Sequence, residues 1–153
     1  AVIGGPNHLD MVKRRKHGYL QALKEARRPI DRSLVVCYKM DFEVARNATI
    51  QLLQSEDRPD AILAFNDIVT YAAFDAIKSL GMSIPEDVAI IGFTDGDTAA
   101  FVTPRLSAIM DQASVQGMKA CELLMKNING DTRIYREVVP MILKIRESSE
   151  KNL

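Results

Sequence analysis

The chain has 153 residues, of which 47% are hydrophobic and 26% charged, and its 20 Lys and Arg residues balance its 20 Asp and Glu residues. This length and composition suffice for one hydrophobic core and exclude an intrinsically disordered, fibrous or repeat architecture. The formal net charge of zero also excludes a global positive field that would draw the chain onto nucleic acid or an anionic membrane, so any contact with DNA must come from another part of the protein.

The apolar runs and the N-terminal residues indicate the cellular location of the protein. The apolar runs are shorter than the roughly 20 residues that span a bilayer. The opening residues, AVIGGPNHLD, lack the charged region and the long apolar stretch of a signal peptide. We therefore expect a soluble, cytoplasmic protein. The chain begins on an apolar segment without an initiator Met, which indicates a cut inside a longer protein.

Four short apolar segments follow one another along the first two thirds of the chain, and each is bounded by turn or helix-cap residues. Such segments are typical of buried strands. They are AVIGG from Ala1, LVVCY from Leu34, AILAF from Ala61 and VAIIGF from Val88.

The stretches between these segments carry apolar residues at helical spacing. Asp41 and either Asn66 or Asp67 are placed to cap the second and third helices, and Gly81 is placed to end the third. The resulting βαβαβαβ order predicts an α/β fold, because strands joined by helices run parallel through right-handed crossovers. We expect a doubly wound parallel sheet with helices on both faces.

The alternation changes after Pro104. Residues 114–130 form one amphipathic helical pattern that ends at Gly130, and a β-rich run follows over residues 135–146. These elements do not continue the strand–helix rhythm. The chain is therefore predicted to leave the first sheet and then return to it.

The polar residues that follow the four strands are predicted to share one edge of the sheet. In open α/β sheets, ligands bind beyond the carboxyl ends of the strands. Those ends are residues 4–7, 38–40, 66–67 and 94–97. The sequence has no nucleophile elbow, phosphate-binding loop or zinc motif. We interpret this edge as a ligand-binding rim without catalysis.

Several spaced motifs occur in order along the chain, among them DAILAFND from Asp60, GMSIPEDV from Gly81, PRLS from Pro104 and IRES from Ile145. Together they resemble the effector-binding core of the lactose-repressor family of bacterial transcription regulators. The resemblance implies a periplasmic-binding-protein-like core of two lobes, of which this chain is the C-terminal part. Residues 1–98 would form the C-terminal lobe, residues 99–130 a crossover and a helix of the N-terminal lobe, and residues 131–153 the return strand and tail. The DNA-binding headpiece would lie outside this chain.

The same resemblance implies which residues bind the effector. Arg15 matches an arginine that reaches into the cleft, Asn66 a polar contact, and Met40 lies near an aromatic stacking position. Thr94 replaces a commonly found aspartate that accepts hydrogen bonds from ligand hydroxyls, and Asp95 is the candidate substitute. A planar guanidinium suits a carboxylate or paired sugar hydroxyls. The effector stays open, with a carbohydrate as the first choice.

The resemblance also implies a homodimer that forms through the C-terminal lobe. Exposed aromatic and aliphatic residues suit a symmetric contact. The candidate interface residues are Tyr71, Phe74, Asp75, Phe101 and Val102.

We therefore expect the effector-binding and dimerisation module of a transcription regulator. A small molecule would bind between the two lobes, close them and act allosterically on the headpieces. Operator DNA would be contacted only through the headpiece. The alternative is an extracytoplasmic sugar-binding protein of a transport system. An enzyme on the same fold is a third possibility, although we expect no enzymatic activity and no cofactor.

The remaining reactive residues favour structural roles. The DGDT motif at residues 95–98 lacks the ligand spacing of a calcium loop, so no metal is expected. His8 and His17 have no partners at a recognisable spacing and are interpreted as surface or packing residues. Cys37 and Cys121 are expected to be buried thiols, with a disulfide between them as the alternative.

Overall fold

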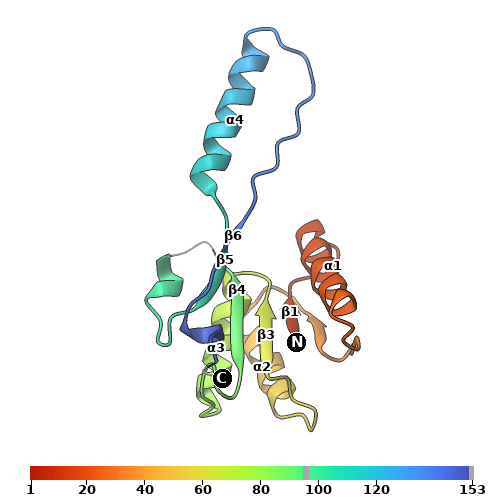
Figure 1. The fold of residues 1–153 in the computed structure, drawn as a ribbon, viewed down its shortest axis with the longest axis vertical. Helices are drawn as coiled ribbons and strands as arrows, with labels where there is room; N and C mark the ends of the chain where they lie inside the picture. Colours follow the sequence, from red (N-terminus) through yellow and green to blue (C-terminus); the bar gives the residue numbers. More distant parts are fainter. Residues whose placement is uncertain (95–96, 152–153) are drawn as a thin grey trace.

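The computed structural model describes residues 1–94 and 97–151 and contains a six-stranded sheet in the order β2-β1-β3-β4-β5-β6 (Figure 1). The strands are β1 Val2–Gly4, β2 Val35–Cys37, β3 Ala61–Ala64, β4 Ala89–Phe93, β5 Ser107–Met110 and β6 Ile142–Lys144. The helices are α1 Asp10–Glu25, α2 Phe42–Leu53, α3 Asp67–Ser79 and α4 Ala113–Ile128, with short 3-10 turns η1 Asp97–Ala100 and η2 Glu147–Ser149.

The sheet is parallel from β2 to β5, and β6 pairs antiparallel with β5. The four strands predicted from the sequence are confirmed as β1 to β4, each separated from the next by a helix. The doubly wound α/β fold is therefore confirmed. The strand order reverses direction between β1 and β3, which is the topological switch point where such folds bind ligands.

The two faces of the sheet carry two separate apolar clusters. Ile3, Ile62 and Ile90 point to the face that α2 and α3 cover, and they form the larger cluster with these helices. On the other face, Val2 and Phe65 pack with Val12 of α1. Successive side chains of a strand alternate between faces, so the near-continuous apolar character of these strands follows from burial on both sides.

The ends of the helices follow the predicted capping signals. The Asp41 side chain accepts a hydrogen bond from the Val44 backbone N–H at 3.1 Å. At the start of α3 the cap is Asn66, whose Oδ1 accepts from the Val69 N–H at 2.9 Å. Gly81 follows α3 with a φ of +70°, a conformation that glycine adopts without the penalty of a Cβ atom.

The chain leaves the sheet later than the sequence analysis placed it. Residues 107–110 form β5 as a further parallel strand beside β4, so the departure comes after Met110 and not at residue 98. Beyond it, α4 stands away from the sheet with the return segment alongside it (Figure 1), and none of its described residues is buried. Of the predicted β-rich run, only Ile142–Lys144 forms a strand.

Residues 111–141 form an arm that projects from the sheet, and its two ends lie next to each other. The Gln112 side-chain amide donates a hydrogen bond to the Pro140 carbonyl at 2.7 Å, which links the outgoing and returning segments. β5 and β6 continue this pairing into the sheet, with Met110 opposite Ile142. The arm therefore joins the sheet through two adjacent segments.

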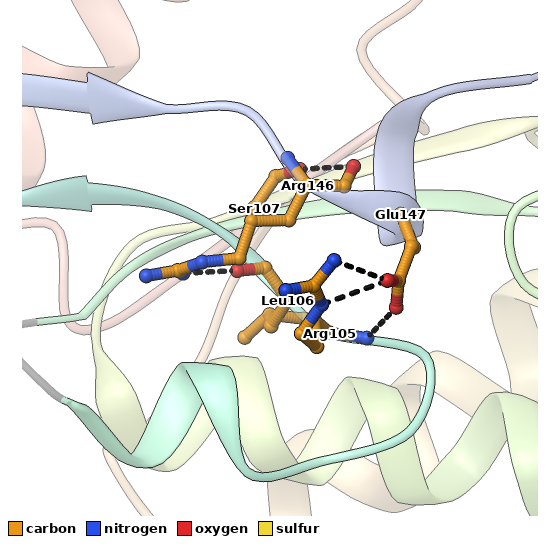
Figure 2. Close-up of polar contacts among 5 residues, drawn as sticks. All are labelled: Arg105, Leu106, Ser107, Arg146 and Glu147. Carbon is orange, nitrogen blue, oxygen red and sulfur yellow. Dashed lines mark hydrogen bonds and ion pairs between the residues drawn. The ribbon is translucent and has the colours of Figure 1, made fainter.

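The returning chain is fixed to the sheet by polar contacts around the start of β5 (Figure 2). The Arg105 Nε and backbone N–H both donate to the Glu147 carboxylate at 2.7 Å. Arg146 Nη1 donates to the Leu106 carbonyl at 2.5 Å, and the Arg146 backbone N–H donates to the Ser107 hydroxyl at 2.7 Å. These contacts join segments about forty residues apart in the chain and extend the attachment beyond the pairing of β5 with β6.

Ser148 completes this attachment inside the core. Its fully buried hydroxyl donates to the Ile90 carbonyl at 2.6 Å and accepts from the Ser107 N–H at 2.8 Å. Both backbone groups belong to strands, so the tail satisfies polar groups that would otherwise be buried without partners.

Both cysteines are free thiols, and Cys37 is half-buried. The prediction that Cys121 is buried is wrong: it is exposed, because it lies on α4, which none of the described residues covers on that side. No helix within the described ranges combines the length and apolar character needed to cross a membrane.

Candidate functional site

A cavity of about 170 Å³ lies at the carboxyl edge of β3, β4 and β5, beside the switch point. It collects side chains from α1, the start of α3, the end of β4, β5 and both segments that lead to the arm. The lining residues are Met11, Arg15, Asn66, Asp67, Phe93, Thr94, Ile109, Asp111 and Met141. Arg15, Asn66 and Thr94, which were predicted to bind effector, are thus brought together.

Arg15 is held in place on one side of the cavity. One of its guanidinium nitrogens donates to the Phe65 carbonyl, and the guanidinium carbon lies 3.9 Å from the centroid of the Phe93 ring. The Phe65 and Phe93 rings meet edge to face at 6.2 Å. The cation over the ring and the hydrogen bond together fix the orientation of the side chain.

Burial lowers the pKa of the Arg15 guanidinium, while the negative charges of Asp111 and Asp67 oppose that shift. The arginine remains protonated, because its ordinary pKa is far above neutrality. The cavity therefore holds a fixed positive charge near two carboxylates.

Two polar atoms at this cavity are buried without a hydrogen-bond partner among the described residues, Asn66 Nδ2 and Thr94 Oγ1. The other end of the Asn66 amide is occupied as the cap of α3, and Thr94 is only 3% exposed. Buried polar groups nearly always have partners. The lining of the cavity therefore includes an amide donor and a hydroxyl whose partners are not among the described residues.

The structure does not bring Met40 to this cavity. Its side chain lies over Gly5, where a Cβ atom would stand 2.8 Å from Met40 Cγ, and the residue is 39% exposed. A ligand contact of Met40 stays a prediction. Asp95, the candidate substitute for the aspartate replaced by Thr94, lies outside the described residues.

The sequence analysis did not single out Asp111, and it placed Asp67 at the ligand-binding edge while leaving open whether Asn66 or Asp67 caps the helix. Asp111 follows β5, a strand that the apolar pattern did not reveal, so the rule about strand ends was not applied to it. Asp67 did stand at a predicted strand end, and the assignment of the cap to Asn66 leaves its carboxylate facing the cavity.

The residues predicted for a dimer interface differ in exposure. Phe101 is 81% exposed. Tyr71, Phe74 and Val102 are half-buried and pack against the larger apolar cluster. Asp75 is exposed and forms an ion pair with an arginine of α2 at 2.6 Å. Only part of this set therefore offers free apolar surface.

His8 and His17 are exposed. Within residues 1–94 and 97–151, no three His, Cys, Asp or Glu side chains gather in a way that would hold a metal ion.

Comparisons with known proteins agree with this architecture. Residues 1–149 match the periplasmic binding protein-like domain. The HTH-type transcriptional repressor PurR of Aliivibrio salmonicida is 35% identical over 118 residues, which cover 76% of this chain and 35% of that protein. The HTH-type transcriptional regulator CelR of Thermobifida fusca is 30% identical over 149 residues, covering 97% of this chain and 44% of that protein.

Among solved structures, a complex of the transcriptional regulator CelR with cellobiose superimposes with a TM-score of 0.85 at 28% identity, covering 97% of this chain and 46% of that one. The chain thus spans less than half the length of these relatives, which are transcription regulators. The match over nearly the whole chain and the sheet order together show that the chain belongs to the periplasmic-binding-protein-like domain family, in the form carried by regulators of the lactose-repressor family.

Proposed function

We propose that this chain is the effector-binding and dimerisation module of a bacterial DNA-binding transcription regulator that senses a small molecule, with a carbohydrate favoured. One observation carries the proposal. Arg15, Asn66 and Thr94 come from α1, α3 and the end of β4, and they converge on one cavity at the switch point of the sheet.

The chemistry of the cavity suits a polyhydroxylated molecule. Asn66 Nδ2 is a donor without a partner among the described residues, and the Thr94 hydroxyl both donates and accepts. Arg15 offers further N–H groups beyond the one that Phe65 occupies. Phe93 and Met11 add apolar walls against which the C–H face of a sugar ring packs. The cellobiose complex of a related regulator supports this class of ligand.

We assign α4 to a second lobe, the rest of which would come from a part of the protein outside this chain. Residues 1–98, extended by β5 and β6, would make the C-terminal lobe, and residues 131–141 would return from the other lobe. The helix exposes apolar residues that a folded protein would normally cover. The large exposed ones are Met118, Leu124, Met125 and Ile128.

The position of the cavity offers a route from ligand to lobe movement. Asp111 and Met141 line it, and they begin and end the two segments that lead to α4. A ligand in contact with both would favour one arrangement of the lobes over another, which is allostery through differential binding to two conformations. Operator DNA would be bound by a headpiece elsewhere in the whole protein, in a homodimer that uses the surface around Phe101.

The test uses the whole protein that carries this chain. Binding to operator DNA, identified by selection from random sequence, is followed by fluorescence anisotropy while a panel of sugars is titrated, and sugar binding is measured by calorimetry. We expect a sugar to change the affinity for DNA. Arg15→Ala should abolish this response, whereas Arg14→Ala, on the exposed surface of the same helix, should preserve it.

A whole protein that binds no DNA and carries a secretory signal would contradict the proposal and point to a transport protein. Turnover of a sugar or nucleotide by that protein would point to an enzyme.

A further inference from the structure

The charges around the cavity do not balance. Among the residues that the structure describes, its lining contains one cation, Arg15, and two carboxylates, Asp67 and Asp111. Both carboxylates act on the guanidinium from a distance, and Asp111 exerts the stronger effect. Within the described ranges, none of the three side chains takes part in an ion pair. The cavity therefore presents a net negative charge to an entering molecule.

The Arg15 guanidinium is also less free to contact a ligand than the carboxylates are, because it already has partners within the protein. Its Nη1 donates to the Phe65 carbonyl and its flat face lies on the Phe93 ring. Asp111 is exposed and lines the same cavity, on the segment that leaves β5. An anion bound beside Arg15 would therefore share the cavity with a carboxylate that carries the same sign of charge as itself.

We propose that this site selects its effector by charge: it takes an uncharged or amine-bearing polyhydroxylated molecule and rejects phosphorylated or carboxylated ones, with Asp111 as the residue that sets this specificity. This inference rests on the proposed function. It adds the charge class of the effector and a specificity-determining role for Asp111.

Asp111 determines the specificity more than Asp67 does. Both carboxylates lie close to a helix N-terminus, Asp67 in the first turn of α3 and Asp111 next to Gln112, the N-cap residue of α4. Unlike the half-buried Asp67, Asp111 is exposed and open to an entering molecule. Its carboxylate accepts hydrogen bonds from sugar hydroxyls or from an ammonium group, and these bonds are stronger than those to an uncharged acceptor.

The walls of the cavity fit the same class of molecule. Phe93, Ile109 and Met141 supply apolar surface beside the polar groups. A sugar ring presents C–H groups on its faces and hydroxyls at its rim, so both kinds of surface find a match. A phosphate group would lose water at these walls while facing the carboxylates.

The first experiment measures binding by calorimetry to the whole protein that carries this chain, with ligands matched in carbon skeleton. The sets are glucose, glucosamine, glucuronate and glucose 6-phosphate, and ribose with ribose 5-phosphate. The uncharged or amine-bearing members should bind at least about tenfold tighter than the anionic ones. Asp111→Asn should reduce that preference by about tenfold. Asp57→Asn, on an exposed loop outside the cavity, should leave it unchanged.

The second experiment needs no natural effector. Inorganic phosphate is titrated into the same protein, and the signal of the Asn66 side-chain amide is followed by NMR. Millimolar phosphate should leave this signal unchanged in the wild type and shift it in Asp111→Asn.

Two results would overturn the inference: equal affinity for anionic and neutral members, or a phosphate response that is the same with and without Asp111. Either would leave the sensor proposal intact. DNA binding that no ligand alters would instead contradict the sensor proposal, and the phosphate titration would still decide on charge selection.

Discussion

At the scale of single residues, Asn66 combines two roles that belong to different atoms. Its Oδ1 caps α3 through the Val69 N–H, and its Nδ2 is buried at the cavity without a partner among the described residues. The cap fixes the orientation of the amide, so the donor is positioned before a ligand arrives. Such preorganisation reduces the entropy lost on binding.

Two substitutions at Asn66 distinguish its role as a helix cap from its role as a ligand contact. Asn66→Ala should lower the free energy of unfolding by about 1 kcal/mol, because the cap is lost, and should also weaken effector binding. Asn66→Asp keeps an acceptor at the cap, where the helix dipole favours its charge, and should retain stability. Asn66→Asp also replaces the Nδ2 donor by an oxygen, so effector binding should be weakened as in Asn66→Ala. Urea unfolding followed by circular dichroism and calorimetric titration measure the two effects. Equal effector affinity of Asn66→Asp and wild type would exclude the amide as a contact.

Gly92 lies in β4, where the strand packs against α3. A Cβ atom added there would overlap the fully buried side chain of Thr70, 2.9 Å from its Cβ. The Thr70 hydroxyl donates to the Asn66 carbonyl at 2.6 Å, so a shift of Thr70 would reach the residue that caps α3. Gly92 is therefore required by close packing.

We predict that Gly92→Ala lowers the free energy of unfolding by about 1–3 kcal/mol, the usual cost of overpacking a core. Gly18→Ala is the matched control, because a Cβ at Gly18 meets nothing within 4 Å and the residue lies on the exposed surface of α1. It should be neutral or should stabilise by up to about 1 kcal/mol, since alanine favours the helix. Urea titration of both variants checks the difference, and equal effects would mean that the fit between β4 and α3 is loose.

At the scale of elements, the apolar pattern predicted β1 to β4 because each is a short apolar run flanked by turn residues, although β1 alone is buried along its whole length and β2 is half-buried. It did not reveal β5. Ser107 and Ser148 place hydroxyls inside the core there, and the hydrogen bond between Ser148 and the Ser107 N–H joins residues 41 positions apart. A pattern of local hydrophobicity does not register such long-range polar pairing.

The same limit explains the candidate site. Arg15, Asn66 and Thr94 follow from the positions of strand ends and from family resemblance, and the structure brings them to one cavity. Asp111 was missed with β5, because a strand end is recognised only after its strand. Met40 was named from a loosely aligned loop, and loop geometry is the part of a fold least determined by periodicity.

The attachment of η2 to the start of β5 predicts a dependence on pH. Hydrogen bonds from Arg105 hold the pKa of the Glu147 carboxyl below its usual value of 4.5. The folded chain therefore binds this proton less readily than the unfolded chain does. The stabilisation is fully present above the unfolded pKa and is lost as pH falls through the folded pKa.

Between about pH 5 and pH 3, the urea midpoint of the wild type should therefore fall more steeply than that of Glu147→Gln, which carries no titrating group at this position. Glu56→Gln, on an exposed loop, should follow the wild type. Parallel curves for wild type and Glu147→Gln would show that the contact with Arg105 does not stabilise the folded state.

At the scale of the whole molecule, the chain divides into a sheet lobe and an arm. The apolar clusters lie between the sheet and α1, α2 and α3, and α4 contributes no buried residue to them. The arm nevertheless reaches the cavity at its base, through Asp111 and Met141. The part of the molecule that adds least to the core is thus placed to register a ligand.

This division predicts that the sheet lobe folds without the arm. In β5 and β6, Met110 pairs directly with Ile142, so an Asn-Gly turn in place of residues 111–141 would close a two-residue hairpin. The free energy of unfolding should change by less than about 1 kcal/mol, because the apolar clusters stay intact. Effector binding should be lost with Asp111 and Met141. Urea unfolding and calorimetry measure the two outcomes. Collapse of the shortened chain to an unfolded state would show that α4 and residues 131–141 stabilise the sheet, and the assignment of the helix to a second lobe would then lose its physical basis.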